Sequence, residues 1–433
     1  MSSLDKKREE FRKYLEGAGA IDNMTKALIK LYEQQNKPAD AVKFLRKNMC
    51  ESCPDDEQYE AVAADLQQAN KKICALEREL SEMKGTIKRT ASEINLALTK
   101  GLADLESEEN AGILKKVLTK NVMDNLKELK TKFKGTLLDC IQSGLEILDL
   151  KVGAFACDAE AYTLFAELFD NLIENLQGFK SEDTQPACDW GESCKLSDLD
   201  PEGYFVQSTR VQAIRSVSDY PFASIMKIEH YEEIMAKVQN VAKCMSGELK
   251  GKFHPLEGMD SDFKKVLLDK RVLMESSPIL KAANGTRFWP VGRGVFINEA
   301  ETFIVRVNEE DHLRFISTEA GGNLRTAYER LMNGVTMVCK DICVARDERL
   351  GFLTFSPDNL GSTLQVSAMM KLEKLPTVDC KLDNLVEKFE MKAYKEDNGL
   401  YKISKKQMGL TEFETAQTFA ECIAAIIEVE KSL

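Results

Sequence analysis

The spacing of apolar residues changes along this chain of 433 residues, and that change limits the folds it can adopt. From residue 59 to residue 97 the apolar residues recur at alternating steps of four and three, which is the heptad pattern of a coiled coil. Residues 302–307 and 352–355 instead have the β-branched and aromatic content of strands. We therefore expect an α+β chain in which a helical head and a coiled coil precede a body that contains a sheet.

The first 50 residues predict three short helices. Gly17 and Gly19 end the first helix, Asp22 can cap the second, and Pro38 opens the third at its first turn. Such a unit is too small to bury much core alone. We expect it to pair with another copy or with a partner helix.

The heptad seam leaves two interpretations open. Charged flanks and few helix breakers favour a coiled-coil homodimer or heterodimer. The alternative is one long amphipathic helix that lies on the surface of its own chain, because Ala69, Thr90 and Ala97 make the seam uneven.

The charge balance excludes two classes of partner. The chain has 59 basic and 71 acidic residues, for a formal charge of −12. Binding to nucleic acid or to an anionic membrane needs a basic surface, so we expect neither partner. No segment approaches the roughly 18 to 20 apolar residues of a membrane span, which favours a soluble cytoplasmic protein.

The cysteines do not form a recognisable metal site or disulfide framework. All twelve are scattered without a repeating spacing, which is typical of reduced thiols. Cys50 and Cys53 form one CxxC sequence, but no second Cys or His pair follows at the spacing of a zinc site. We therefore expect a helix end before Pro54 and no bound metal.

The N-terminal segment resembles the c-Myc-binding protein family. Residues 9–49 read EEFRKYLEGAGAIDNMTKALIKLYEQQNKPADAVKFLRKNM and precede the predicted coiled coil. Members of that family are small helical adaptors associated with A-kinase anchoring proteins and with ciliary axoneme complexes. The resemblance implies protein partners that bind through residues 1–100, and a cytoskeletal location in a cilium or flagellum.

The rest of the chain carries an ordered set of segments: GELKGKFHPLEGM, FWPVGRGVF, VNEEDHLRFIS, GFLTFSPDNLGS and QMGLTEFE. With the helical pattern before them, they resemble phosphagen kinases of the arginine kinase type over residues 103–433. The resemblance implies a small all-helical domain at 102–197, and a large antiparallel sheet flanked by helices at 198–433. The head at 1–55 and the coiled coil at 56–101 complete the predicted domains.

The resemblance also implies where ATP phosphates would bind. Phosphoryl transfer to a guanidine depends on positioning and charge neutralisation, and arginine forks suit phosphate oxygens. Phosphagen kinases use five such arginines, and the resemblance assigns two of them to Arg210 and Arg314. Two other positions hold Gln212 and Gln365, and the loop that carries the fifth is shortened near Lys395.

The positions that would hold the guanidine have changed as well. Glu310 matches the catalytic carboxylate, which can orient a guanidinium and accept its proton. Ser356 stands where the family has a reactive cysteine. In the segment that matches the specificity loop, Lys151 would repel a cationic substrate, and Phe155 lacks a tyrosine hydroxyl.

Two further residues near these motifs have structural interpretations. Residues 308–314 form a charged segment directly after a predicted strand, a usual place for functional groups, although the residues alone favour a solvated turn. Within it, His312 is expected to stabilise a loop by hydrogen bonding rather than to act as a base. Trp289 is expected to lie in a core.

These changes predict little turnover. Losing one preorganised donor typically lowers the rate by about 10² to 10³, so three losses could remove roughly 10⁴ to 10⁶. We expect a pseudoenzyme that serves as a structural adaptor in a cytoskeletal assembly, with at most weak binding of ATP or ADP and Mg²⁺. Two alternatives stay open: an active or weakly active ATP:guanidino phosphotransferase, and a sensor that binds nucleotide without phosphoryl transfer.

Overall fold

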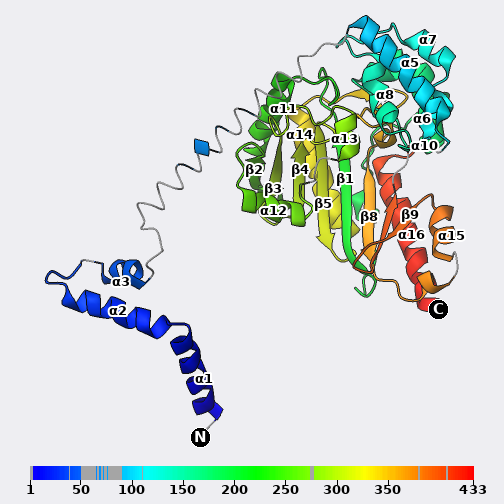
Figure 1. Cartoon of the computed structure of the whole chain (residues 1–433). Coiled ribbons are helices and arrows are strands. Elements are labelled where there is room, and N and C mark those ends of the chain that lie inside the picture. The colour runs from blue at the N-terminus through cyan, green and yellow to red at the C-terminus, as the bar shows by residue number, and fades with distance from the viewer. Residues whose placement is uncertain are drawn as a thin grey trace. The chain divides into compact units, whose positions relative to one another are not determined.

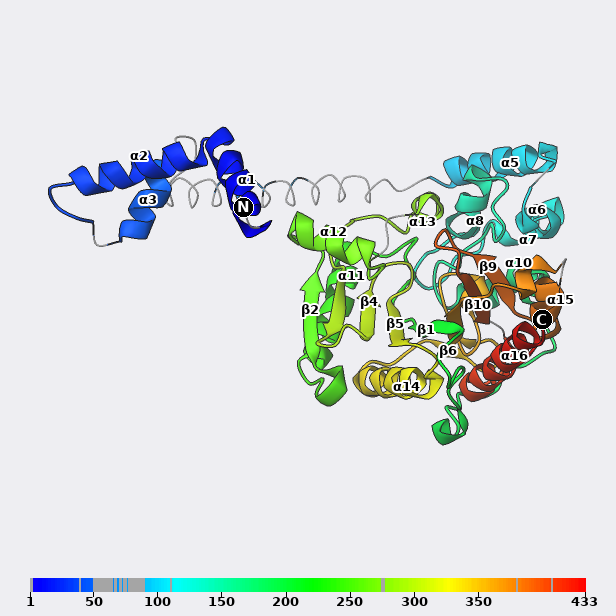
Figure 2. The same ribbon diagram turned by 90° about the horizontal axis from the view of Figure 1, so that it is seen from below.

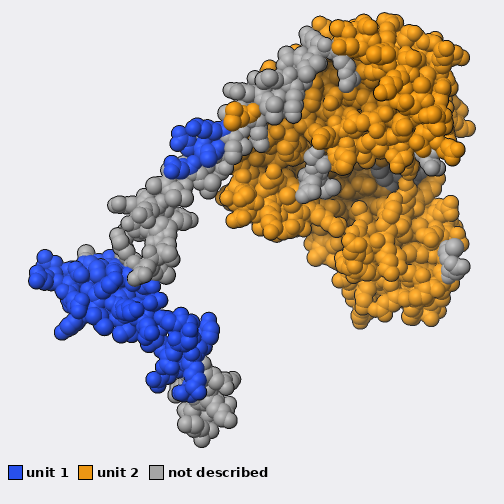
Figure 3. Space-filling view, viewed as in Figure 1, with its two compact units in different colours: residues 1–75 blue, residues 76–433 orange. Residues whose placement is uncertain are grey.

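The computed structural model describes residues 3–38, 40–49, 90–109, 111–273, 277–378, 381–405 and 408–433, with the single residues 65, 68, 69, 72 and 76. The chain divides into two compact units, residues 1–75 and 76–433, which Figure 3 shows in different colours. Most of the predicted coiled coil and the CxxC sequence lie outside the described residues, so those predictions stay predictions. None of the helices in the described part of the chain has the length and apolar character that a membrane crossing requires.

Unit 1 contains the three predicted helices: α1 (Ser3–Gly17), α2 (Ala20–Glu33) and α3 (Ala41–Met49) (Figure 1). Two predicted boundaries are wrong. Helix α2 begins before Asp22, because Gly19 takes the left-handed conformation (φ 67°) that glycine adopts without steric penalty. Helix α3 begins at Ala41, so Pro38 precedes the helix instead of occupying its first turn.

Unit 1 buries little apolar surface by itself. Among its described side chains, Ala27 is the only buried apolar one. Phe11, Tyr14 and Tyr32 are 62%, 68% and 84% exposed. This agrees with the expectation that such a small helical unit cannot build a core alone.

The first part of unit 2 is a helical region with its own core, made of α5 (Ala91–Ser107), α6 (Ile113–Val117), α7 (Lys120–Leu126), α8 (Leu137–Glu146), α9 (Ala161–Leu164) and α10 (Ala166–Gln177). Capping boxes start α5 at Thr90 and α8 at Thr136. Helix α5 continues across the predicted boundary at residues 101–102. Ile94 and Ala97, the last positions of the heptad seam, pack against this core.

The second part of unit 2 is built on an eight-stranded antiparallel sheet in the order β2-β3-β4-β5-β1-β8-β10-β9. Its strands are β1 (Val206–Arg215), β2 (Gly251–Pro255), β3 (Gly294–Asn298), β4 (Phe303–Val307), β5 (Leu313–Ala320), β8 (Gln365–Met370), β9 (Lys392–Lys395) and β10 (Tyr401–Lys405). The helices around it are α11 (Ile228–Ala242), α12 (Ser261–Asp269), α13 (Pro278–Ala282), α14 (Leu324–Asp341), α15 (Lys381–Lys388) and α16 (Glu412–Ser432), with short 3₁₀ turns η1 (Ser193–Lys195), η2 (Gly247–Leu249), η3 (Pro357–Asn359) and η4 (Leu375–Thr377). The predicted fold class is confirmed.

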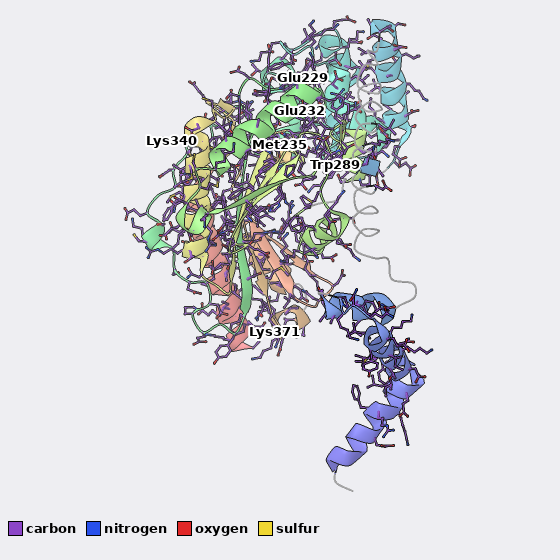
Figure 4. All side chains as sticks on the ribbon, turned by 90° about the vertical axis from the view of Figure 1, so that its left-hand side faces the viewer. Glu229, Glu232, Met235, Trp289, Lys340 and Lys371 are labelled. Atoms are coloured by element: carbon purple, nitrogen blue, oxygen red, sulfur yellow. The ribbon has the colours of Figure 1, made fainter. Side chains whose placement is uncertain are left out.

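One face of the sheet, the packed face, is covered by α11, α14 and α16 (Figures 1 and 2). Successive side chains of a strand point to opposite faces, so Val211 and Ala213 of β1 and Phe315 of β5 enter this core. Figure 4 marks two of the covering helices, with Glu229, Glu232 and Met235 along α11 and Lys340 in the last turn of α14.

The opposite face, the cleft face, presents the alternate residues: Arg306 of β4, Arg314 of β5, Arg210 and Gln212 of β1, and Gln365 of β8. Part of it is covered by α12, whose Leu267 packs with Ile304, Ile316 and other apolar residues in a smaller cluster. Trp289 packs against that cluster, which agrees with its predicted core position (Figure 4). Most of the remaining residues on the cleft face are polar.

The predicted strand at 352–355 is wrong for most of its length. Only Gly351–Phe352 forms a strand (β7), which pairs with β6 (Arg346–Asp347). Beyond it, the Phe355 N–H donates to the Asp311 carboxylate at 2.8 Å, and the Phe355 carbonyl accepts from Ala156 N at 2.9 Å. The segment uses its hydrogen bonds to join the helical region to the sheet, which sequence pattern alone does not reveal.

Candidate functional site

A cleft of about 340 Å³ lies between the helical region and the cleft face, within the size range of small-ligand sites. It brings together five of the predicted site residues: Lys151, Phe155, Glu310, Arg314 and Ser356. The other lining residues are Leu150, Val152, Ser277, Ile279, Leu280, Arg306, Glu309, Phe355 and Asp358.

One wall of the cleft is the segment 150–155. The Phe155 ring stacks on Phe355, with centroids 4.9 Å apart and an interplanar angle of 17°. The Tyr162 hydroxyl of α9 donates to the Thr354 carbonyl at 2.8 Å, which also ties the helical region to the segment that carries Phe355. Ser356, which is buried, and Lys151, which is exposed, also line this cleft, and Lys151 lines a neighbouring one as well.

The opposite wall holds the predicted carboxylate. Arg314 Nη2 donates to Glu310 Oε2 at 2.8 Å, and Asp311 Oδ2 lies 3.8 Å from the same guanidinium. Burial favours the neutral form of Arg314, but the Glu310 and Asp311 carboxylates outweigh burial and raise its pKa. Glu310 is therefore held beside a permanent cation.

Arg210 is half-buried on β1 and differs from Arg314 in its partners. Its Nε is buried and has no hydrogen-bond partner among the described residues. Burial, together with the positive charges of Arg306, Arg271 and Arg314, lowers the pKa of Arg210 to about 10. A buried cation without a counter-charge is unfavourable, so this position suits an anionic ligand.

Gln212 and Gln365, the two substituted positions, lie directly opposite each other on β1 and β8. Gln212 Nε2 donates to Gln365 Oε1 at 2.8 Å. The two amides satisfy each other in part and contribute no charge to the cleft face. Beside them is a second cleft of about 280 Å³, whose lining includes Gln365, Lys392 and Lys402.

Two arginines that sequence reasoning missed, Arg306 and Arg271, also lie here. Arg306 Nε donates to the Val272 carbonyl at 2.7 Å, Nη2 donates to the Arg271 carbonyl at 2.6 Å, and Nη1 pairs with Glu309 at 3.1 Å. Arg271 follows α12 in a left-handed turn (φ 54°), and its Nη1 lies 3.5 Å from Glu396 Oε2. The alternation in residues 302–307 would have placed Arg306 on the face of Arg314, but nothing local marks Arg271.

The loop between β4 and β5 confirms the structural role expected for His312. Its Nδ1 accepts the Val217 N–H at 2.9 Å, and its Nε2 lies 3.0 Å from the Pro221 carbonyl, which places the proton of the neutral ring on Nε2. Burial lowers the His312 pKa to about 4. The predicted loop 308–314 is shorter than expected, because Leu313 and Arg314 belong to β5.

The shortened segment near Lys395 folds as a hairpin. Strands β9 and β10 pair with each other and add to the sheet beyond β8. Glu396, at the turn of this hairpin, is the residue that approaches Arg271. The hairpin therefore reaches the turn after α12 at the cleft face.

Comparison with known families supports two separate similarities. The models for the N-terminal domain and for the C-terminal catalytic domain of ATP:guanido phosphotransferases match residues 108–174 and 233–433. The c-Myc-binding protein model matches residues 5–86. Both families are those that the sequence motifs indicate.

Individual relatives agree. Arginine kinase of Plodia interpunctella is 45% identical over 346 residues, covering 78% of this chain and 98% of the relative. Arginine kinase 1 of Drosophila melanogaster is 44% identical over 347 residues, with the same coverage of both chains.

Solved structures give the same fold. The duplicated taurocyamine kinase of Schistosoma mansoni with bound transition state analog components matches with a TM-score of 0.74 and 35% identity, over 78% of this chain and 48% of that one. This chain thus spans about half of that duplicated kinase. Lombricine kinase matches with a TM-score of 0.71 over 76% of this chain and 95% of that one, and at 24% identity it supports the fold alone.

Proposed function

Because this chain belongs to the ATP:guanido phosphotransferase family, the phosphagen kinases, we propose that its cleft binds the phosphates of a nucleotide and transfers a phosphoryl group to a guanidine far more slowly than the arginine kinases do. The observation that carries this proposal is the hydrogen bond between Gln212 and Gln365. It occupies two positions where the resemblance expects arginines.

The Gln pair affects the reaction through charge. The transferred phosphoryl group carries its charge on three equatorial oxygens, and fixed cations lower the barrier by neutralising it. Two neutral amides cannot do this. Losing each such donor lowers a rate by about 10² to 10³, and the effects of neighbouring donors are not additive.

The remaining residues fit a nucleotide. The buried, unpartnered Nε of Arg210 suits a phosphate oxygen, and Arg314 lies on the neighbouring strand. When bound, ATP with Mg²⁺ would supply the transferable phosphoryl group. Glu310 would orient the guanidine and accept its proton. Because Arg314 already donates a hydrogen bond to Glu310, the guanidine would have to share this carboxylate with Arg314.

A second candidate, a phosphagen kinase of ordinary rate, is favoured by the 45% identity to an arginine kinase and by the retained Glu310, Arg210 and Arg314. A coupled assay of the full chain with ATP and arginine, creatine or taurocyamine separates the two. Turnover of several per second would refute the slow-transfer proposal. Undetectable transfer with measurable MgADP binding would instead describe a nucleotide sensor.

A role as a cytoskeletal adaptor rests on unit 1. Its similarity to the c-Myc-binding protein family and the exposed Phe11, Tyr14 and Tyr32 support a tether that binds protein partners. An axonemal assembly is the partner that the resemblance suggests. Co-purification with the full chain, compared with a Tyr32→Glu variant, tests this role; recovery of only metabolic enzymes by both chains would contradict it.

A further inference from the structure

We infer that Arg271 and Arg210 together bind an oxyanion group of a phosphate-bearing ligand, on the β4–β5 side of β1. This inference rests on the proposed function, since it concerns the same face of the sheet. It adds Arg271, which is none of the positions that the resemblance assigns to phosphate binding. It also moves the positive charge of the site away from the flank occupied by Gln212 and Gln365.

The first support is the way Arg271 is held. Arg306 lies on the cleft face of β4, directly opposite Arg314 on β5. From there its guanidinium donates to the backbone carbonyls of both Arg271 and Val272, at 2.6 and 2.7 Å. These two bonds fix the turn after α12 against the cleft face, so the backbone of Arg271 is anchored while its side chain is 72% exposed.

The second support is the weak hold on the Arg271 side chain. Its Nη1 lies 3.5 Å from Glu396, at the turn of the β9–β10 hairpin. Glu396 is 24% exposed, but the Arg271 side chain is mostly exposed, so water and salt compete for its charge and the ion pair holds it weakly. A multiply charged phosphate group can therefore take the place of Glu396.

The third support is the charge balance around Arg210. Arg314 pairs with Glu310 and Asp311, and Arg306 pairs with Glu309. Arg210 has no carboxylate partner among the described residues, and its Nε is buried without a hydrogen bond. Glu396 follows Lys395, which pairs with Tyr401, and Tyr401 pairs with the β8 residue opposite Val206, so the ion pair places the Arg271 side chain towards the end of β1 that carries Arg210. The positive charge of Arg271 also contributes to the lowered pKa of Arg210. A bound oxyanion would relieve that repulsion.

The test is binding of three probes to the full chain by isothermal titration calorimetry. MgADP and inorganic tripolyphosphate carry the phosphate groups, and adenosine carries none. The Arg271→Ala variant is expected to bind both phosphate probes about tenfold more weakly, because a charge-assisted hydrogen bond is lost. Adenosine binding is expected to stay unchanged. If tripolyphosphate binding is unaffected while MgADP binding weakens, Arg271 contacts the nucleoside and the inference is wrong.

Two further variants complete the design. Arg325→Ala is the matched control, since Arg325 is also exposed and paired with a glutamate, but lies on α14 at the packed face; we expect no change. Glu396→Gln removes the competing carboxylate and is expected to tighten phosphate binding by roughly twofold to fourfold.

The outcomes separate this inference from the proposed function. Equal binding of MgADP by the wild type and Arg271→Ala overturns the inference and leaves slow transfer standing. Weaker binding by Arg271→Ala, together with turnover of several per second in the wild type, supports the inference and refutes slow transfer. A wild-type chain that binds neither phosphate probe overturns the inference as well.

Discussion

The two faces of the sheet differ in what their residues do, although they share the same strands. On β1, Val211 and Ala213 are buried in the core under α14 and α16, whereas Arg210 and Gln212, their immediate neighbours, face the cleft. The packed face is mostly apolar, and its buried Arg215 is paired with Glu412 of α16. On the cleft face, Gln212 and Gln365 form an amide pair at two positions where the resemblance expects arginines. Arg306 and Arg271 lie on the other side of β1, towards β4.

This difference shows that the side chains of a binding site can change while the fold that positions them stays the same. Because side chains alternate along a strand, substitutions at every second position leave the packed core untouched. The comparison therefore predicts that substitutions on the packed face lower stability without changing ligand binding. Substitutions on the cleft face should change ligand binding without lowering stability.

The largest expected effect is on the packed face. Phe315→Ala removes a fully buried ring and should lower the free energy of unfolding by about 3 to 5 kcal/mol, as measured by urea denaturation. Thr318→Ala, on the same strand and on the cleft face, is the control and should change it by less than about 0.5 kcal/mol. Similar losses of unfolding free energy in both variants would contradict the predicted difference between the two faces.

The next effect concerns His312, in the loop that leads into β5. Its pKa is about 4 in the folded chain and 6.5 as an ordinary value, so below pH 6.5 only the unfolded chain takes up this proton. Stability should therefore fall as the pH drops from 6.5 towards 4, by on the order of 3 kcal/mol in total.

The measurement for His312 is urea unfolding at pH 7.5 and pH 4.5, with the His312→Gln variant alongside. The variant should lose part of the pH dependence because it does not titrate. An equal pH dependence in both chains would show that His312 is not the buried neutral group described here.

The smallest of the three expected effects concerns the Gln212–Gln365 pair. Gln212→Arg with Gln365→Arg should tighten MgADP binding on the order of tenfold and raise turnover, since it restores charged donors beside Arg210. Gln207→Arg, an exposed position on the same strand, is the matched control. If the double variant binds no better than this control, the Gln pair is not what limits the site.

Much of this arrangement could be predicted from the sequence. The ordered motifs predicted an antiparallel sheet behind a helical region. They also named Glu310, Arg314, Ser356, Phe155 and Lys151, which the structure brings to one cleft. Each of these residues lies within or beside a recognisable segment, which is why sequence alone could single it out. Their roles in binding and transfer stay predictions.

The rest depended on three-dimensional contacts. Arg271 is one of 59 basic residues, and only the left-handed turn after α12 and the two bonds from Arg306 hold it at the cleft face of the sheet. The segment 352–355 has strand-forming residues, but the backbone hydrogen bonds of its Phe355 go to Asp311 and Ala156. No local pattern encodes either partner.

The edge strands β2 and β9 have a consequence for self-association. They are five and four residues long and carry Lys252 and Pro255 on one edge and Lys392 and Lys395 on the other. Short strands with lysine or proline resist pairing with the sheet of another molecule, since a repelled charge or a missing N–H interrupts the ladder. Both free edges of the sheet are thus poor templates for edge-to-edge pairing with a second copy of the chain.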